Sequence, residues 1–173
     1  DATVVATPEL TAYVQENFGH EHTLPAGGVA TLAFGAAVAV ARRQGAVGNR
    51  SRSRSERVTT VTLVGAAAIG AAVLLPGFRA AVSPAATVVA AGFLACVAAT
   101  GWLLAARTRL STLGITAAAG IGFLSHPFGD VFLAAPPPLF SPFGPPVWTG
   151  RVALSADPTL DLLGVLFVEL ATV

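Results

Sequence analysis

Long runs of residues without a charged side chain constrain the fold of this chain more than any other feature. An α-helix needs about 20 predominantly apolar residues to cross the hydrocarbon core of a membrane. Four such runs cover residues 25–41, 59–76, 85–106 and 110–126, and a fifth, mostly apolar segment covers residues 158–173. We therefore predict an all-α protein, a polytopic transmembrane helical bundle of four to five spans.

The composition supports a membrane protein over a soluble one. Of the 173 residues, 54% are hydrophobic and 11% are charged, whereas a soluble domain typically has about 25% charged residues. The formal net charge of +1 and the lack of a nucleic-acid motif predict a lipid bilayer as the partner and no nucleic acid. All ten basic residues are arginine, which is typical of a GC-rich prokaryote, such as a halophile.

The stretches between the apolar runs suggest one membrane domain with three polar parts. Residues 1–24 form a polar N-terminal segment, residues 42–58 an arginine-rich loop, and residues 127–157 a proline-rich loop that we expect to lie over one mouth of the bundle. The chain begins at Asp1 without a methionine, so we expect an N-terminal truncation. Arginine-rich loops next to spans mark the cytoplasmic side, which predicts a multi-pass protein of the cell membrane.

Counting spans relates two distant polar segments. If the second and third runs both cross the membrane, the start of the first run and the end of the fourth share one face. His22 then lies on the same side as His126 and Asp130. The arginines that follow the first and third runs predict that this is the extracytoplasmic face.

These three residues suit a metal ion. Polar groups at the end of a membrane-grade helix cost several kcal/mol unless they are paired, bound to a metal or hydrated. Imidazole and carboxylate are ligands for divalent metals, zinc first among them. We predict His22, His126 and Asp130 as ligands. Glu21 would be the catalytic base or a partner that supports a ligand. Without a metal, His22 would be an interfacial residue, and His126 and Asp130 would bond to each other and cap the loop.

Two acidic residues near the C-terminus have a simpler interpretation. Asp157 precedes Pro158 and the last apolar segment, and Asp161 lies in its first turn. Acidic residues at these positions satisfy backbone N–H groups and interact favourably with the helix dipole. We expect Asp157 to be an N-cap and Asp161 a first-turn acid.

The segment SHPFGDVFLAAPPPLFSPF, residues 125–143, resembles a known signature. It is similar to S-H-L-x-x-D-x-x-T-P-x-G-V-P-L-x-W-P-F of a membrane-bound metal-dependent hydrolase family, also called LexA-binding, inner-membrane-associated hydrolases. RVALSADPTLDLL, residues 151–163, also resembles the sequence that follows in archaeal members. The positions that match the signature are Ser125, His126, Asp130, Pro138, Leu139, Pro142 and Phe143.

A second, weaker match lies upstream. NFGHEHT, residues 17–23, aligns with H-R-G-x-T-H-S of the same family and agrees at Gly19 and His22. The chain departs from that pattern at Asn17 and Glu21, which stand where the family has His and Thr, and at Thr23 in place of Ser. The acidic P-D-x-D-H cluster of the family is absent from the sequence.

The resemblance implies a hydrolase in which metal-activated water attacks an ester or phosphoester, of a lipid or another membrane-proximal substrate. The site would contain Glu21 with His22, His126 and Asp130, supported by a second layer of polar groups, Asn17, Thr23 and Ser125. One alternative is a non-catalytic membrane protein, either a degenerate family member or a scaffold. Another is a transporter fragment, for which internal repeats and polar groups at mid-membrane would be expected.

Overall fold

The computed structural model describes residues 23–45, 54–133, 139–145, 147 and 152–172, and this part of the chain is helical without a strand. This confirms the predicted all-α class. The helices are α2 (Leu24–Gly45), α3 (Arg54–Ala81), α4 (Pro84–Ala105), α5 (Thr112–Leu133) and α6 (Pro158–Thr172). Three of them, α2, α3 and α4, are long and apolar enough to cross a membrane.

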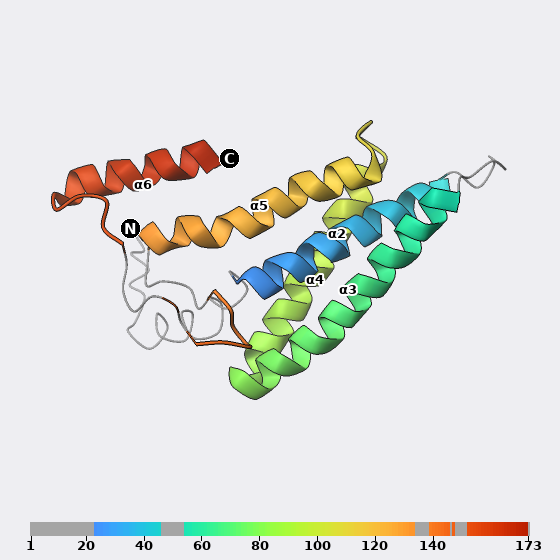
Figure 1. Ribbon diagram of the computed structural model, residues 1–173, viewed down its shortest axis with the longest axis horizontal. Helices are drawn as coiled ribbons and strands as arrows, with labels where there is room; N and C mark the ends of the chain where they lie inside the picture. Colours follow the sequence, from blue (N-terminus) through green and yellow to red (C-terminus); the bar gives the residue numbers. More distant parts are fainter. Residues whose placement is uncertain (1–22, 46–53, 134–138, 146, 148–151, 173) are drawn as a thin grey trace, which may run out of the picture.

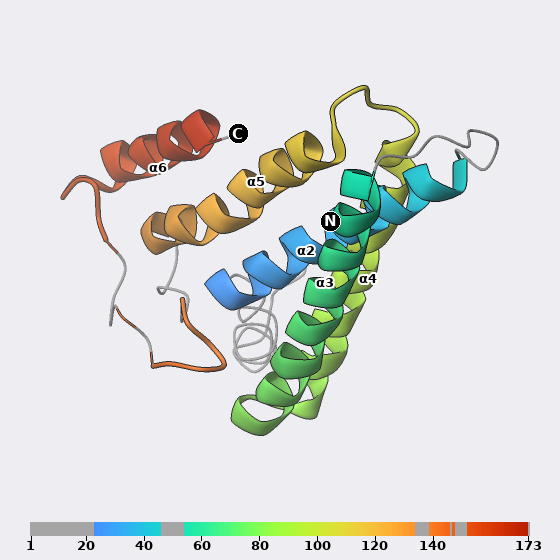
Figure 2. The same ribbon diagram turned by 45° about the vertical axis from the view of Figure 1, so that its right-hand side comes forward.

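Helix α2 occupies the centre of the bundle. It packs against α3, α4 and α5, while α3 also packs against α4, and α6 packs against α5. Figures 1 and 2 show α3 and α4 as a hairpin of long helices, with α2 crossing it and α5 running beside α2. Each of the three groups of buried apolar residues includes side chains from α2.

The core is built from few large side chains. Phe34 and Val38 of α2 meet Val97 of α4 and Ile115 of α5 in the largest cluster. Leu74 and Phe78 of α3, each 1% exposed, pack with Ala26, Val29 and Ala90 in the second. Most other large apolar side chains of α3 are exposed, as expected where lipid rather than protein is the neighbour.

Glycines let the helices approach α2 closely. An ideal Cβ built on Gly27 would lie 2.8 Å from the Phe123 carbonyl oxygen, and one on Gly101 would lie 2.7 Å from the Phe34 carbonyl oxygen. Gly35 meets the Thr116 side chain in the same way, at 2.6 Å. Close backbone approach through small residues is the usual way in which helices associate in lipid.

The predicted end of the fourth run at residue 126 differs from the structure, because α5 continues through Pro127 to Leu133. Proline has no N–H and cannot donate to the carbonyl four residues earlier, which is that of Phe123. That carbonyl faces Gly27 of α2, where a Cα–H can approach it. Contact with a neighbouring helix can therefore offset the lost hydrogen bond and let the helix continue.

The arginine-rich segment is also more helical than the predicted loop at residues 42–58. Helix α2 extends to Gly45 with Arg42 and Arg43 in its last turn, and α3 begins at Arg54. Arginine is a good helix former, and cations in a last turn interact favourably with the C-terminal end of the dipole. Residues 46–53 lie outside the described residues.

Residues 139–145, a part of the predicted proline-rich loop, lie at one end of the bundle. The Leu24 N–H donates to the Leu139 carbonyl (2.9 Å), and Leu139 is buried. Pro142 and Phe143 lie against Gly77 of α3. This segment therefore closes the mouth at which α2 begins and α3 ends.

Candidate functional site

The predicted metal site would lie at the end of the bundle where α2 begins. Thr23 is fully buried, and its Oγ1 accepts a hydrogen bond from the Ala26 N–H (3.3 Å). The Thr23 hydroxyl therefore caps α2. Asn17, Glu21 and His22 lie outside the described residues.

The contacts between α2 and α5 set an antiparallel register. Gly27 faces Phe123, Thr31 faces Gly120, and Gly35 faces Thr116. Each turn forward along α2 thus corresponds to about one turn back along α5. One further turn brings Thr23 level with Pro127, and both of these residues are fully buried.

On α5 the predicted site residues occupy consecutive turns. The Ser125 hydroxyl donates to the Gly122 carbonyl (3.2 Å), and His126 is exposed. Position 130 belongs to the same helix, but the Asp130 side chain lies outside the described part. Because the helix is continuous, positions 126 and 130 are one turn apart on one face.

Within the described residues, no group of three His, Cys, Asp or Glu side chains is close enough to hold a metal ion. His126 is the predicted ligand whose side chain the structure describes. A site at this end needs further donors, and His22 and Asp130 are the predicted ones. The ligand set thus stays a prediction.

Comparison with known proteins gives a short likeness. A 23-residue stretch is 78% identical to the UPF0173 metal-dependent hydrolase of Halorubrum lacusprofundi, a match that covers 13% of this chain and 9% of that protein. No family model and no solved structure matches the chain. The likeness is to a metal-dependent hydrolase, the broad class that the sequence motifs resemble.

Asp157 and Asp161 have the structural roles expected of them. Asp157 Oδ1 accepts hydrogen bonds from the Thr159 (2.8 Å) and Leu160 (3.0 Å) N–H groups, which caps α6. Asp161 is 5% exposed, and its Oδ1 accepts from the Leu154 N–H at 2.7 Å. This contact fixes the segment before α6 against the first turn of the helix.

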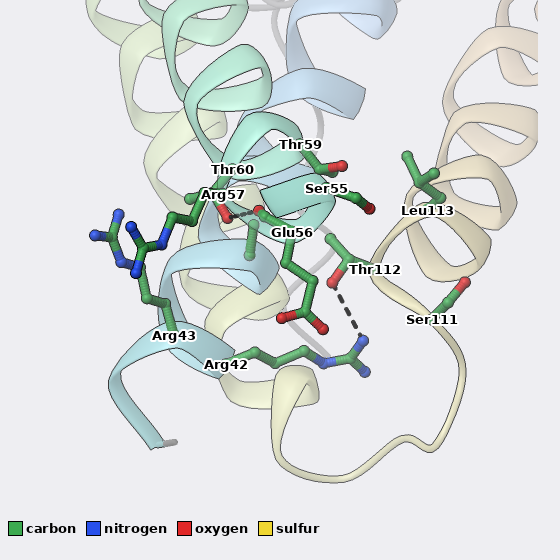
Figure 3. A pocket seen from close by; sticks show the side chains of 11 residues that line it. Arg42, Arg43, Ser55, Glu56, Arg57, Thr59, Thr60, Ser111, Thr112 and Leu113 are labelled. Carbon is green, nitrogen blue, oxygen red and sulfur yellow. Dashed lines mark hydrogen bonds between the residues drawn. The ribbon is translucent and has the colours of Figure 1, made fainter. Parts of the chain in front are cut away.

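The opposite end of the bundle contains a pocket that the sequence analysis missed. It has a volume of about 330 Å³ and lies between the last turn of α2 and the first turns of α3 and α5. Figure 3 shows Arg42, Arg43 and Arg57 around it, with the Glu56 carboxylate directed toward the Arg42 side chain. The available signal was a pair of arginines directly after an apolar run, which we interpreted only as a marker of membrane sidedness.

Arg42 connects three elements at this pocket. Its Nε donates to the Ala105 carbonyl (3.3 Å) and its Nη2 to the Thr108 carbonyl (3.2 Å). Its Nη1 donates to the Thr112 hydroxyl (3.4 Å). The first bond satisfies a carbonyl in the last turn of α4, which has no partner within its own helix. Arg42 thereby joins the ends of α2 and α4 to the start of α5.

Proposed function

We propose that this chain is a membrane-bound metal-dependent hydrolase whose site lies at the end of the bundle where α2 begins. His22, His126 and Asp130 are the proposed ligands of a divalent metal ion, zinc first, and Glu21 is the proposed base. Asn17, Thr23 and Ser125 would support them. The substrate is an ester or phosphoester, and the site faces the extracytoplasmic side.

The α2–α5 register is the observation that carries the proposal. It makes Thr23, the residue directly after His22, level with Pro127, the residue directly after His126. His22 and His126 are 104 positions apart in the sequence, yet each is directly followed by a residue at the same level of the bundle. Convergence of distant His and Asp residues is what a metal site requires.

The donor types fit such an ion. Two imidazoles and one carboxylate with an open fourth position form a common catalytic zinc set. A divalent metal held there would lower the pKa of a bound water and polarise an ester or phosphoryl oxygen. Glu21 would accept the proton of that water. The Thr23 O–H could orient a ligand as a donor, and the Ser125 oxygen, whose O–H donates to the Gly122 carbonyl, could do so as an acceptor.

Apolar surface near the site favours a substrate with a lipid-like part. Phe128 is 48% exposed on the turn of α5 that follows His126, and Phe143 is 56% exposed on the covering segment. Leu124 and Phe140 are also exposed at this end. Such side chains can contact acyl chains while the polar residues engage the ester group.

The experiment that tests this function is metal analysis of the detergent-purified protein by inductively coupled plasma mass spectrometry. We expect near-stoichiometric metal in the wild type and loss of most of it in H22A, H126A and D130A. His20→Ala is the matched control, because it removes the same side chain two positions from a proposed ligand and should keep the metal.

The outcomes separate the enzyme from the alternatives. Metal lost in all three ligand variants but kept in H20A would support the site and justify assays with ester and phosphoester lipids. Background metal in a folded wild type would overturn the proposal and favour the non-catalytic scaffold. If H20A loses as much metal as the ligand variants, the metal binds the N-terminal segment without the proposed geometry.

A further inference from the structure

The pocket at the opposite end of the bundle has the chemistry of an anion site. Its three arginines, Arg42, Arg43 and Arg57, outnumber its one carboxylate, Glu56, so the lining has a formal charge of +2. Hydroxyl groups of Ser55, Thr59 and Ser111 also line it. Guanidinium groups bind phosphate oxygens through paired N–H donors, and hydroxyls add further donors.

The arginines of the pocket divide into two roles. Arg42 is half-buried and is held by the three hydrogen bonds to α4, the following loop and α5. Arg43 and Arg57 are exposed, and Figure 3 shows their side chains extending from α2 and α3 on the other side of the pocket from Thr112. Arg42 thus forms one wall of the pocket, and Arg43 and Arg57 add two exposed guanidinium groups to its lining.

Two further features favour an anion. The first turns of α3 and α5 line the pocket, so the positive ends of both helix dipoles lie there. A volume of about 330 Å³ lies within the range of small-ligand sites. The pocket therefore has both the charge and the room for a phosphate group with a small substituent.

Apolar surface adjoins the charged pocket. Leu113 lines it and is 62% exposed, and Val58, in the first turns of α3, is 56% exposed. Leu110, just before α5, is 57% exposed. A phosphate in the pocket would therefore lie at the boundary between the apolar and the arginine-rich surface, where the headgroup of a phospholipid resides.

We propose that this pocket, built by Arg42 and closed by Arg43 and Arg57, binds a phosphate group, of an anionic phospholipid headgroup or of a soluble phosphate ester. The proposal is independent of the hydrolase site, because it uses other residues at the other end of the bundle. Glu56 sets the affinity, because its carboxylate competes with the phosphate for the arginines.

The test measures binding to the full chain in two arms. In the first, the protein is placed in nanodiscs of phosphatidylcholine with or without phosphatidylglycerol, and retained lipid is counted by native mass spectrometry. In the second, glycerol phosphate and inorganic phosphate are titrated into the detergent-purified protein by calorimetry. Both arms compare the wild type with the pocket variant R43Q/R57Q and the control R107Q/R109Q.

The control removes two arginines from the same end of the bundle without touching the pocket lining. We expect R43Q/R57Q to raise the dissociation constant about tenfold. Each exposed charge pair contributes up to about a factor of five to the affinity, and the two factors multiply. R107Q/R109Q should change it less than twofold. E56Q should strengthen binding. A variant that fails to fold would lose binding, so misfolding cannot explain such a gain.

Each result is decisive. Selective phosphatidylglycerol retention that R43Q/R57Q abolishes, with no calorimetric signal, supports a lipid headgroup as the ligand. A signal in both arms with the same variant order supports a phosphate site that also accepts soluble esters. Equal losses in the pocket and control variants, or no binding in either arm, would overturn the proposal.

Discussion

Helices α2 and α3 are both long and apolar, yet their surroundings differ. Nine residues of the 22-residue α2 are buried, whereas three of the 28-residue α3 are. Three helices pack on α2, while Ile69 and Val73 of α3 are exposed. The difference teaches that apolar character alone does not select the centre of this bundle, as expected if lipid solvates the exposed face of α3.

Close backbone contact distinguishes α2. Its Gly27 and Gly35 meet α5, and its Phe34 carbonyl meets Gly101 of α4, all at distances that a Cβ would not allow. In α3, Gly70 and Gly77 also make close contacts, but to side chains, those of Val29 and Pro142. What distinguishes α2 is that its backbone is approached closely by both α4 and α5.

The largest expected effect is that of Gly27→Val, which tests the close contact between α2 and α5. The new side chain would begin 2.8 Å from the Phe123 carbonyl oxygen and push α2 from α5, at a cost of about 3 kcal/mol in the free energy of unfolding. Reversible unfolding in mixed micelles, followed by circular dichroism, measures this effect.

Gly28 supplies the control for that variant, because a Cβ there would have no neighbour within 4 Å. Gly28→Val should leave the free energy of unfolding within about 0.5 kcal/mol of the wild type. Equal losses at positions 27 and 28 would mean that helix propensity, not the α2–α5 contact, explains the effect.

Leu74→Ala tests the burial of α3 side chains, which differs along this helix. Leu74 is 1% exposed, whereas Ile69 on the same helix is 67% exposed. The cavity left at Leu74 should cost about 2 kcal/mol, toward the lower end of the range for buried leucines because the unfolded helix stays in an apolar solvent. Ile69→Ala should cost less than about 0.5 kcal/mol. Unfolding in the same micelles tests both. A loss at position 69 equal to that at position 74 would contradict the difference in burial between the two positions.

The smallest expected effect concerns the polar end of α2. Arg42→Gln removes charge-assisted hydrogen bonds to the Ala105 and Thr108 carbonyls, and we expect a loss of about 1 kcal/mol because the side chain is only half-buried. Arg43→Gln, one residue later and exposed, should have almost no effect on stability. If the two variants unfold alike, Arg42 does not join the helix ends as described.

Much of the helical architecture was predictable. The apolar runs predicted at 59–76 and 85–106 lie within or almost within α3 and α4, because a charge-free run of that length satisfies its backbone groups best as a helix. The role of Asp157 as the N-cap of α6 was predictable for a similar reason, since helix capping is a local interaction. Asp161 lies in the first turn as predicted, but its bond to the Leu154 N–H was not predicted.

The candidate metal site was predictable only in part. The sequence indicated which residue types could bind a metal, and the α2–α5 register adds support for their shared level in the bundle. The positions of Glu21 and His22 and the Asp130 side chain lie outside the described residues. The roles of His22 and Asp130 as ligands and of Glu21 as the base remain predictions.

The sequence by itself determined that the chain forms apolar helices and where their charge-free stretches lie, since the spacing of charges along a chain is a local property. Only the tertiary structure decided that α2 is central, that α5 continues through Pro127 with its Phe123 carbonyl beside Gly27, and that Arg42 and Arg57 share a pocket. These features depend on contacts between residues far apart in the sequence. Helix periodicity constrains which face a residue occupies, but not which helix it meets.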